Sequence, residues 1–264
     1  MKITIITSCY NREATIRDCM ESVLSQDFPD IEYIVVDGAS TDGSLDIIRN
    51  VADKVAGDAF RKAHPNFSMK FISEPDSGMY EALNKGLRIA TGDYIGLVHS
   101  DDFLFSRHTV SHIARQLEQT QADFLYGDGL FVCSDNTQKV VRDWIGGTYS
   151  PLKVRHGWLP LHPTCYISRQ TISRKGIYDE SYKIAADSDL LFRYLRAGDL
   201  RVTYLKEYIV RMRMGGLSTD SQRRRQMWEE DIRMLRHNGF RHPRLTKLEK
   251  MMWKVPQFIG AKFK

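Results

Sequence analysis

The sequence contains no run of apolar residues long enough to cross a bilayer. A membrane-spanning helix needs roughly 18 or more consecutive apolar residues, and no stretch of this 264-residue chain approaches that length. The N-terminus, Met1 to Thr7, enters a strand pattern directly and lacks a signal-peptide cleavage site. We therefore expect a protein that stays in the cytoplasm.

Cysteine is scarce as well. The four cysteines, Cys9, Cys19, Cys133 and Cys165, form no CxxC pair and no other metal-type spacing. We expect them to be small, reduced core residues, which argues against a disulfide framework and against a zinc site.

Features of disorder are also missing. Apolar residues make up 42% of the chain, charged residues 27% and aromatic residues 11%, which is the profile of a folded protein. A chain of 264 residues can bury one substantial core, so we expect one main domain with a small appendage.

Positive charge is concentrated at one end. The net charge is +5, but residues 221–264 hold 12 Lys or Arg against 4 Asp or Glu. Such a tail suggests a polyanionic partner, either nucleic acid or an anionic membrane. Apolar residues alternate with the basic ones there, as in an interfacial amphipathic segment, and they include Met251, Met252, Trp253, Phe258, Ile259 and Phe263.

Short apolar strands alternate with amphipathic helices through the first half of the chain. The expected strands are Ile3–Thr7, Ile31–Val36, Met69–Ser73 and Tyr94–Val98, and the expected helices are Ala14–Ser25, Ser44–Val55, Tyr80–Ala90 and Arg107–Thr120. This order predicts right-handed βαβ units and a mostly parallel sheet. The segment Gly57–Ser68 has no clear period and is expected to cross the surface.

The pattern changes beyond Gly129. We expect a strand at Phe124–Tyr126 and an antiparallel hairpin of Leu130–Cys133 with Lys139–Trp144. The later strands are expected at Thr164–Ser168, Val202–Leu205 and Tyr208–Met212, and the later helices at Ala185–Ala197 and Asp220–Asn238. Two prolines make Gly157–Pro163 a loop that we expect to line the site. The chain should therefore be an α/β protein with a mixed sheet and a smaller second half.

Two adjacent carboxylates, Asp101 and Asp102, follow the expected strand Tyr94–Val98. Ligands of open α/β sheets bind outside the carboxyl ends of the strands, so this pair lies where active sites of such sheets usually form. A hard divalent cation that shares its coordination with phosphate oxygens would suit two neighbouring carboxylates. The alternative is an ordinary cap of the helix Arg107–Thr120. The same alternative, a helix cap, applies to Asp187 and Asp189.

The motifs together resemble the family 2 glycosyltransferases of the GT-A fold. The matching pieces are Thr7–Arg12, Val35–Ser44, Glu74–Tyr80, Asn84–Gly86, Ala90–Asp93 and Ser100–Asp102, with looser matches at His162–Thr164, Ala186–Asp189 and Gly215–Ser218. They look most like the bacterial exopolysaccharide and lipopolysaccharide branch, colanic-acid-type transferases included. The resemblance implies a catalytic domain at 1–219, with a nucleotide-sugar half (1–105) and an acceptor half (106–219), followed by a helical basic extension at 220–264.

The resemblance also implies a set of donor-binding residues. Asp102 would hold a divalent metal ion, Mn²⁺ or Mg²⁺, and Asp101 would lie nearer the ribose or a metal-bound water. Asp37 would hydrogen-bond a uracil-type base, with Ser8 and Tyr10 beside it; the alternative for Asp37 is a helix cap. Asp76 and Lys85 complete the implied nucleotide-sugar site.

The general base implied by the resemblance is Asp187. An acceptor hydroxyl is a poor nucleophile, so a carboxylate opposite the leaving group must take its proton. The family often has Glu-Asp at this place, whereas this chain has Ala186 before Asp187, and Asp189 therefore stays open as the alternative. For His162, contact with phosphate, contact with acceptor and a structural role stay open. Gly215 and Gly216 would let a loop close over the diphosphate, or form a plain turn.

The implied activity is an inverting transfer of a sugar, such as that of a UDP-sugar, to a hydroxyl of a glycan or lipid-linked glycan. The enzyme would work at the inner face of the cytoplasmic membrane, and the basic tail would contact anionic lipid. Two other functions compete. One is a nucleic-acid-binding module using the tail, although no nucleic-acid motif appears. The other is a sugar nucleotidyltransferase, which would want a glycine-rich loop in place of Ser8–Arg12.

Overall fold

One mixed sheet organises the molecule. The computed structural model describes residues 1–215 and 224–260, and within them nine strands join a single sheet. The strands are β1 (Ile3–Cys9), β2 (Ile31–Asp37), β3 (Ser68–Ser73), β4 (Tyr94–Leu97), β5 (Phe103–Leu104), β6 (Phe124–Val132), β7 (Val140–Trp144), β8 (Tyr166–Ser168) and β9 (Val202–Arg213).

The sheet has a parallel half and a mixed half. Its order is β3-β2-β1-β4-β8-β6-β9-β5, with β7 paired to β6. The first four strands are parallel, whereas β8 runs antiparallel to both β4 and β6, and β6 is parallel to β9. The prediction of a mostly parallel first half followed by an antiparallel hairpin is confirmed by the pairing of β6 with β7.

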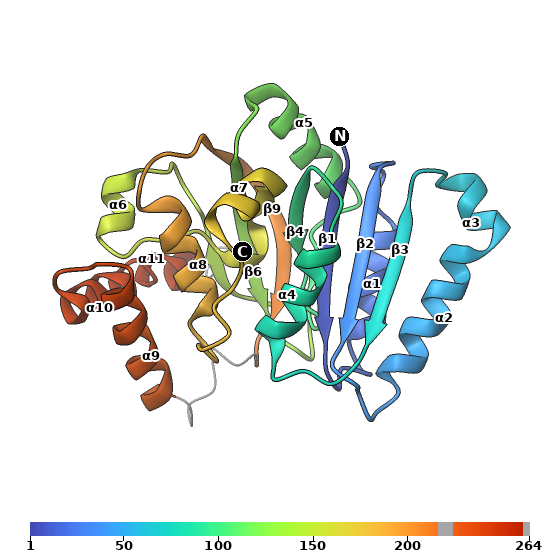
Figure 1. Cartoon of the computed structure of the whole chain (residues 1–264), viewed down its shortest axis with the longest axis horizontal. Helices are drawn as coiled ribbons and strands as arrows, with labels where there is room; N and C mark the ends of the chain where they lie inside the picture. The colour runs from blue at the N-terminus through green and yellow to red at the C-terminus, as the bar shows by residue number, and fades with distance from the viewer. Residues whose placement is uncertain (216–223, 261–264) are drawn as a thin grey trace.

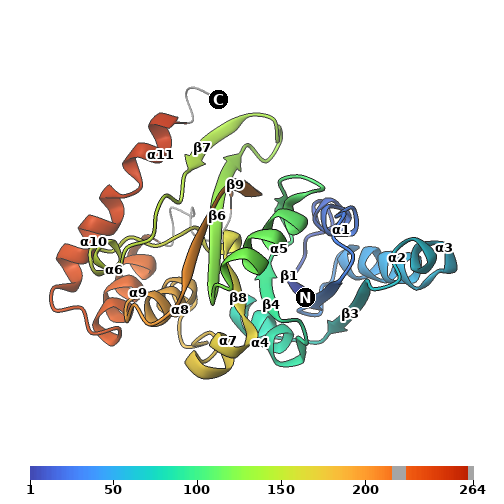
Figure 2. The ribbon, with the colours of Figure 1, turned by 90° about the horizontal axis from the view of Figure 1, so that it is seen from above.

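Helices cover both faces of this sheet (Figures 1 and 2). They are α1 (Ile16–Leu24), α2 (Ser44–Ala56), α3 (Asp58–Ala63), α4 (Met79–Ile89), α5 (Thr109–Thr120), α6 (Pro151–Arg155), the 3₁₀ turn η1 (His162–Thr164), α7 (Arg169–Lys175), α8 (Ala186–Leu195), α9 (Arg224–His237), α10 (Pro243–Met252) and α11 (Val255–Gly260). None of these helices combines the length and the apolar character needed to span a membrane.

The alternation of side chains along a strand explains the two faces. In β1, Ile3 and Ile5 belong to the core that includes α1, α2 and α5, while Ile6 belongs to the core that includes α4 and α8. Because all seven residues of β1 are buried, this strand lies at the centre of the fold. The loop that follows β1 is therefore held between two packed layers.

The structure adds several short elements to those predicted. The segment Gly57–Ser68, predicted to cross the surface, has no buried residue in its helix α3, but this six-residue helix was too short to show a period; its Phe60 packs on His64 and Phe67. Sequence patterns also gave no sign of β5, α6 or α7, all of them seven residues or shorter.

Two errors concern strands that were divided in the prediction. Phe124–Tyr126 and Leu130–Cys133 are one strand, β6, because its glycines do not form a turn. A Cβ at Gly129 would come within 2.4 Å of Leu161, so glycine there permits close packing. Likewise β9 runs unbroken through the polar Lys206-Glu207, with irregular register against β6.

The C-terminal helices lie beside α8, on the side of the molecule away from β3 (Figure 1). Helix α9 contributes Met234 and Leu235, both fully buried, to the same core as Phe192 of α8. Helix α10 packs on α9, and α11 lies against β7. The described part of the predicted basic extension is therefore joined to α8 and β7 by packed contacts.

Candidate active site

The predicted site residues gather where the direction of the strand order changes. Strands β2 and β4 flank β1 on opposite sides, so the loop that follows β1 lies between the loops that follow its two neighbours, a position that we name the crevice. Such a switch point is where open α/β sheets bind nucleotides. The loop after β1, the loop after β2 and the Asp101-Asp102 segment after β4 all begin at this edge.

Two of these loops are fastened to each other. The side-chain oxygen of Asn11 accepts the N–H of Thr41 at 2.9 Å, while its own N–H donates to Ser40 Oγ at 2.9 Å. The N–H of Arg12 donates to Ser44 Oγ at 2.8 Å. In this frame Ser8 is buried and Tyr10 is 58% exposed at the crevice. Tyr10 is thus available to a planar ligand.

Asp37 holds the second loop together. It is fully buried at the end of β2, and its carboxylate accepts hydrogen bonds from Ser40 N–H at 3.1 Å, Ser40 Oγ at 2.5 Å and Ser73 Oγ at 2.7 Å. The helix-cap alternative is wrong, because α2 begins after Gly43. Asp37 therefore braces the loop beside which a base would lie.

Asp76 and Lys85 form the outer wall of the same crevice. Asp76 approaches Gly38 so closely that a Cβ there would lie 2.6 Å from its carboxylate. Burial, with the Glu81 and Asp37 carboxylates nearby, raises the pKa of Asp76. Lys85 instead pairs with Glu74 at 2.9 Å and with Glu81 at 3.3 Å. Lys85 thus ties the Glu74–Gly78 loop to α4.

The Asp101-Asp102 segment is anchored by the end of β9. The backbone N–H of Arg213 donates to Asp102 Oδ1 at 2.9 Å, and its guanidinium donates to the Asp101 carbonyl at 2.8 Å. Neither carboxylate caps α5, which begins at Thr109 after His108, so that alternative is wrong too. The side chain of Asp101 is 27% exposed and its carboxylate lies 3.9 Å from the Arg12 guanidinium.

The electrostatics of this pair suit a cation. Burial raises the pKa of Asp102 well above its usual range, and the neighbouring Asp101 carboxylate raises it further, while Arg213 opposes both effects. A bound cation would relieve this cost, since it favours the ionised carboxylate.

The protein supplies few ligands for such an ion. In the described part of the chain, no three His, Cys, Asp or Glu side chains are grouped closely enough to hold a metal. Magnesium-like ions are commonly held by one or two carboxylates together with water and substrate phosphates. Asp101 and Asp102 fit the arrangement of two carboxylates, in which water and the phosphates of the substrate supply the remaining ligands of the metal.

The two acidic residues of α8 have different surroundings. Asp189 is 1% exposed and accepts hydrogen bonds from Arg193 and from the Asn238 amide, both at 2.7 Å. Asp187 is half-buried in the first turn, where it accepts only the N–H of Ser188, at 2.6 Å, among the described residues. Asp189 is thus committed to a structural ion pair, whereas within the described ranges 1–215 and 224–260 no residue occupies the second carboxylate oxygen of Asp187.

Two histidines stand between the strand-end pair and α8. His99, two residues before Asp101, feels the charges of both Asp101 and Asp187, although burial lowers its pKa. The ring of His162 lies 6.3 Å from that of His99. Asp101 and Asp187, which are far apart in the sequence, are therefore both close enough to one imidazole to act on it electrostatically.

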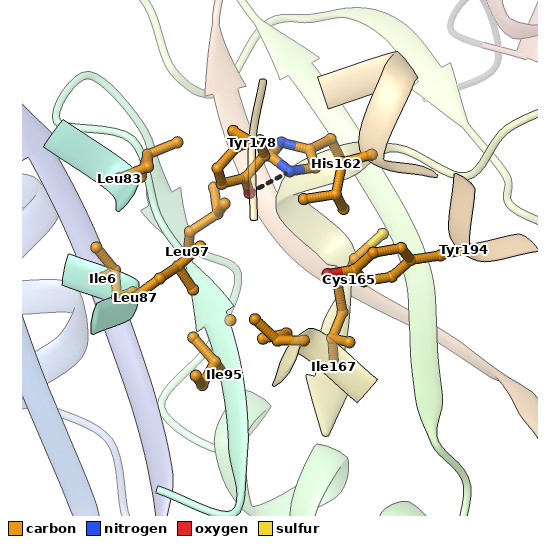
Figure 3. Close-up of a pocket in the computed structure, with 13 residues that line it drawn as sticks. Ile6, Leu83, Leu87, Ile95, Leu97, His162, Cys165, Ile167, Tyr178 and Tyr194 are labelled. Atoms are coloured by element: carbon orange, nitrogen blue, oxygen red, sulfur yellow. Dashed lines mark hydrogen bonds between the residues drawn. The ribbon is translucent and has the colours of Figure 1, made fainter. Parts of the chain in front are cut away.

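His162 is an internal residue. Its Nε2 is 2.8 Å from Tyr178 Oη, and burial lowers its pKa to about 4, so its ring is neutral at pH 7. Both side chains line a cavity of about 20 Å³ with mostly apolar walls, shown in Figure 3. That volume holds one water at most and no sugar. These contacts favour the structural role among the three alternatives for His162.

Glu230 of α9 supports the start of α8, a role that sequence patterns did not indicate. Its carboxylate accepts hydrogen bonds from three successive backbone N–H groups at 2.8–3.2 Å, those of Lys183, Ile184 and Ala185. Only 9% of Glu230 is exposed. The segment that leads into Asp187 is therefore held by a helix more than 40 residues away.

Helix α10 reaches the same place. Lys250 donates to Ser188 Oγ, next to Asp187, and to Asp231 of α9, both at 2.9 Å. Of the predicted loop glycines, Gly215 has φ +115°, and a Cβ there would meet no described residue within 4 Å, whereas Gly216 lies outside the described residues. Gly215 comes two residues after Arg213, so this turn borders the Asp102 side of the site.

Comparison with known proteins gives the family. The model of glycosyl transferase family 2 matches residues 4–181. A "PGL/p-HBAD biosynthesis glycosyltransferase" of Mycobacterium tuberculosis is 28% identical over 219 residues, which is 81% of this chain and 78% of the relative.

Solved structures share the fold. S. aureus TarS in complex with UDP superposes with a TM-score of 0.65 at 19% identity, over 99% of this chain and 68% of that chain. The mannosyltransferase PcManGT of Pyrobaculum calidifontis, in complex with GDP-Man and Mn²⁺, gives 0.64 at 19% identity, over 98% and 73%. The predicted GT-A architecture is thereby confirmed.

Proposed function

The chain belongs to glycosyl transferase family 2, and from that premise we propose that it transfers a sugar from a nucleoside-diphosphate sugar to a hydroxyl group with inversion at the anomeric carbon. The observation that carries this proposal is that Asp101, at the carboxyl edge of the parallel strands, and Asp187, at the start of α8, both act electrostatically on His99. Asp102 is the next residue after Asp101. The proposed site therefore extends from the crevice to the start of α8.

The residues of the crevice would hold the donor. Tyr10 offers an exposed ring to the base of the nucleotide. Asp37 fixes the loop that would lie along the hydrogen-bonding edge of that base. Ser8 and Asp76 line the crevice, and Lys85 fixes its outer loop. Asp102, with Asp101 beside it, would hold a divalent cation, which when bound supplies Lewis-acid stabilisation of the departing diphosphate. Gly215, two residues after Arg213, would let the chain turn close to a phosphate, since its φ of +115° suits glycine.

Asp187 would act as the general base. As the acceptor oxygen bonds to the anomeric carbon, the bond from that carbon to the diphosphate oxygen breaks, and the acceptor proton moves to the Asp187 carboxylate. A positioned base of this kind is typically worth roughly 10²- to 10⁴-fold in rate. Glu230 and Lys250 hold the backbone and the neighbouring Ser188, so the base is fixed before the acceptor arrives.

The donor is proposed to be a UDP-sugar, and the acceptor a glycan or lipid-linked glycan of bacterial surface polysaccharide biosynthesis. TarS, which shares the fold, was solved with UDP, and this supports the choice of nucleotide. The enzyme would work in the cytoplasm at the inner face of the membrane. The nucleic-acid alternative gains no support, because two lysines of the tail are used internally to pair with Asp231.

A screen of nucleoside-diphosphate sugars tests the proposal. Each donor is incubated with the enzyme and Mn²⁺, and release of the free nucleotide is measured against the Asp102→Asn variant. We expect one donor to be hydrolysed slowly without acceptor, and Asp102→Asn to lose that hydrolysis while the protein stays folded. Equal hydrolysis of that donor by both proteins would contradict the assignment.

A further inference from the structure

Helix α10 has its polar side inward. Thr246 and Lys247 are 6% and 7% exposed, whereas Leu245, Leu248 and Met252 are 55%, 51% and 71% exposed. A surface helix normally buries its apolar stripe and turns its charged residues to water. The outer face of α10 therefore leaves three large apolar side chains without protein neighbours to cover them.

The orientation of α10 is fixed by its polar side. Asp231 of α9 accepts both Lys247 and Lys250, and these lysines hold the pKa of Asp231 at about 2 against the effect of burial. Breaking such a buried pair is strongly unfavourable, so the helix cannot rotate to hide its leucines. Trp253 adds a further tie by donating to the His156 carbonyl at 2.9 Å.

The apolar face continues along the chain. Twelve large apolar side chains are exposed among the described residues, and seven of them lie between positions 245 and 258. Met251, Val255 and Phe258 extend the patch from α10 into α11, and Figure 2 shows both helices along the outer rim of the molecule. A patch confined to one rim marks an interaction surface, whereas scattered apolar residues would need no explanation.

Charge indicates what covers this patch. Residues 224–260 hold nine Lys or Arg against four Asp or Glu. Glu230, Asp231 and Lys247 are buried, which leaves eight Lys or Arg against two Asp or Glu at least partly exposed in this range. Arg241 and Arg244 are exposed at the beginning of α10, beside Leu245. An apolar face bordered by arginines is the pattern of a helix that lies in the headgroup region of an anionic membrane.

We propose that the α10 face, defined as Leu245, Leu248 and Met252 with Arg241 and Arg244, docks on an anionic lipid surface. The choice of lipid rests on the proposed function in one respect, since a lipid-linked acceptor would be confined to a membrane. The contact of Lys250 with Ser188 joins the inner side of α10 to the start of α8, so docking would hold Asp187 near the lipid surface with α10 between them.

Vesicle co-sedimentation tests the α10 face. The full chain is pelleted with phosphatidylcholine vesicles that contain or lack phosphatidylglycerol, at low and high salt, and compared with the triple variant Leu245→Ser, Leu248→Ser, Met252→Ser. Phe71→Ser is the matched control, because Phe71 is exposed on β3 at the opposite edge of the sheet. Point substitutions suit this test better than removal of the tail, which would leave Asp231 buried without its lysines.

We expect the wild type and Phe71→Ser to pellet with anionic vesicles only, less so at high salt, and the triple variant to bind at least about tenfold more weakly. Equal pelleting of the wild type and the triple variant would overturn the proposal. So would a wild-type dimer in size-exclusion chromatography that the triple variant dissociates while no protein binds lipid. Donor hydrolysis measured without vesicles reports separately on the transfer function.

Discussion

Glu230 offers a direct test of how the C-terminal helices contribute to the active site. Its carboxylate is the acceptor for three backbone N–H groups just before α8, and Glu230→Ala would leave these donors without it. An unsatisfied buried N–H costs about 1–3 kcal/mol, and water can replace part of the loss. We therefore expect Glu230→Ala to lower the free energy of unfolding by about 3–5 kcal/mol.

The same change should affect catalysis more than donor binding. The 183–185 segment leads into Asp187, and a displacement of about 1 Å at a reacting group can cost roughly 10²-fold in rate. The donor loops follow β1, β2 and β4 and do not touch Glu230. We expect kcat of Glu230→Ala to fall about 10- to 100-fold, while the dissociation constant of the nucleotide stays within about twofold.

Denaturant unfolding, isothermal titration calorimetry with the nucleotide and steady-state kinetics at a temperature where all variants are folded measure these effects. Glu230→Gln keeps an acceptor oxygen but loses its charge, so it should recover most of kcat. Glu229→Ala is the matched control, because Glu229 is exposed and its ion pair within the described residues is with Arg225, one turn earlier. Weakened nucleotide binding with unchanged kcat, or unchanged stability of Glu230→Ala, would refute the reasoning.

Three further predictions follow from the site. Asp189→Asn should lower the free energy of unfolding by roughly 3 kcal/mol, because it breaks a buried pair with Arg193. The kcat per folded molecule should change little, and a loss of kcat without a loss of stability would contradict this. Because the folded pKa of Asp231 is depressed to about 2, its stabilising effect is present above about pH 4 and is lost as pH falls through 2. Unfolding curves of the wild type should lose stability across that window, and Asp231→Asn should lose less. Excess chelator should abolish turnover, and added Mn²⁺ should restore it in the wild type but not in Asp102→Asn; full activity in chelator would exclude a metal at Asp102.

The first half of the fold could be predicted from the sequence because its signals are local. Strands such as Tyr94–Leu97 are short apolar runs bounded by turn residues, and the order of strands and helices restricts the topology to a few possibilities. The position of Asp101 and Asp102 followed from that topology. Whether these two carboxylates cap a helix or bind a ligand could not be predicted from the topology, because the answer depends on the residue at which α5 begins.

The rest depended on contacts between distant segments. The Glu230 carboxylate lies 45 to 47 residues from the N–H groups that it accepts, and no local pattern encodes such a contact. Strand β6 was predicted as two strands, Phe124–Tyr126 and Leu130–Cys133, because the close packing of Gly129 against Leu161 has no local signal. The inverted orientation of α10 likewise follows from Asp231, which a hydrophobic pattern cannot reveal.

The central claim, that Asp187 is the base and the strand-end loops hold the donor, is tested most directly by one comparison. Asp187→Asn is assayed for sugar transfer and, by calorimetry, for binding of the donor nucleotide with Mn²⁺. We predict a loss of about 10²- to 10⁴-fold in kcat with nucleotide affinity unchanged. An Asp187→Asn enzyme that transfers sugar at the wild-type rate would contradict the account.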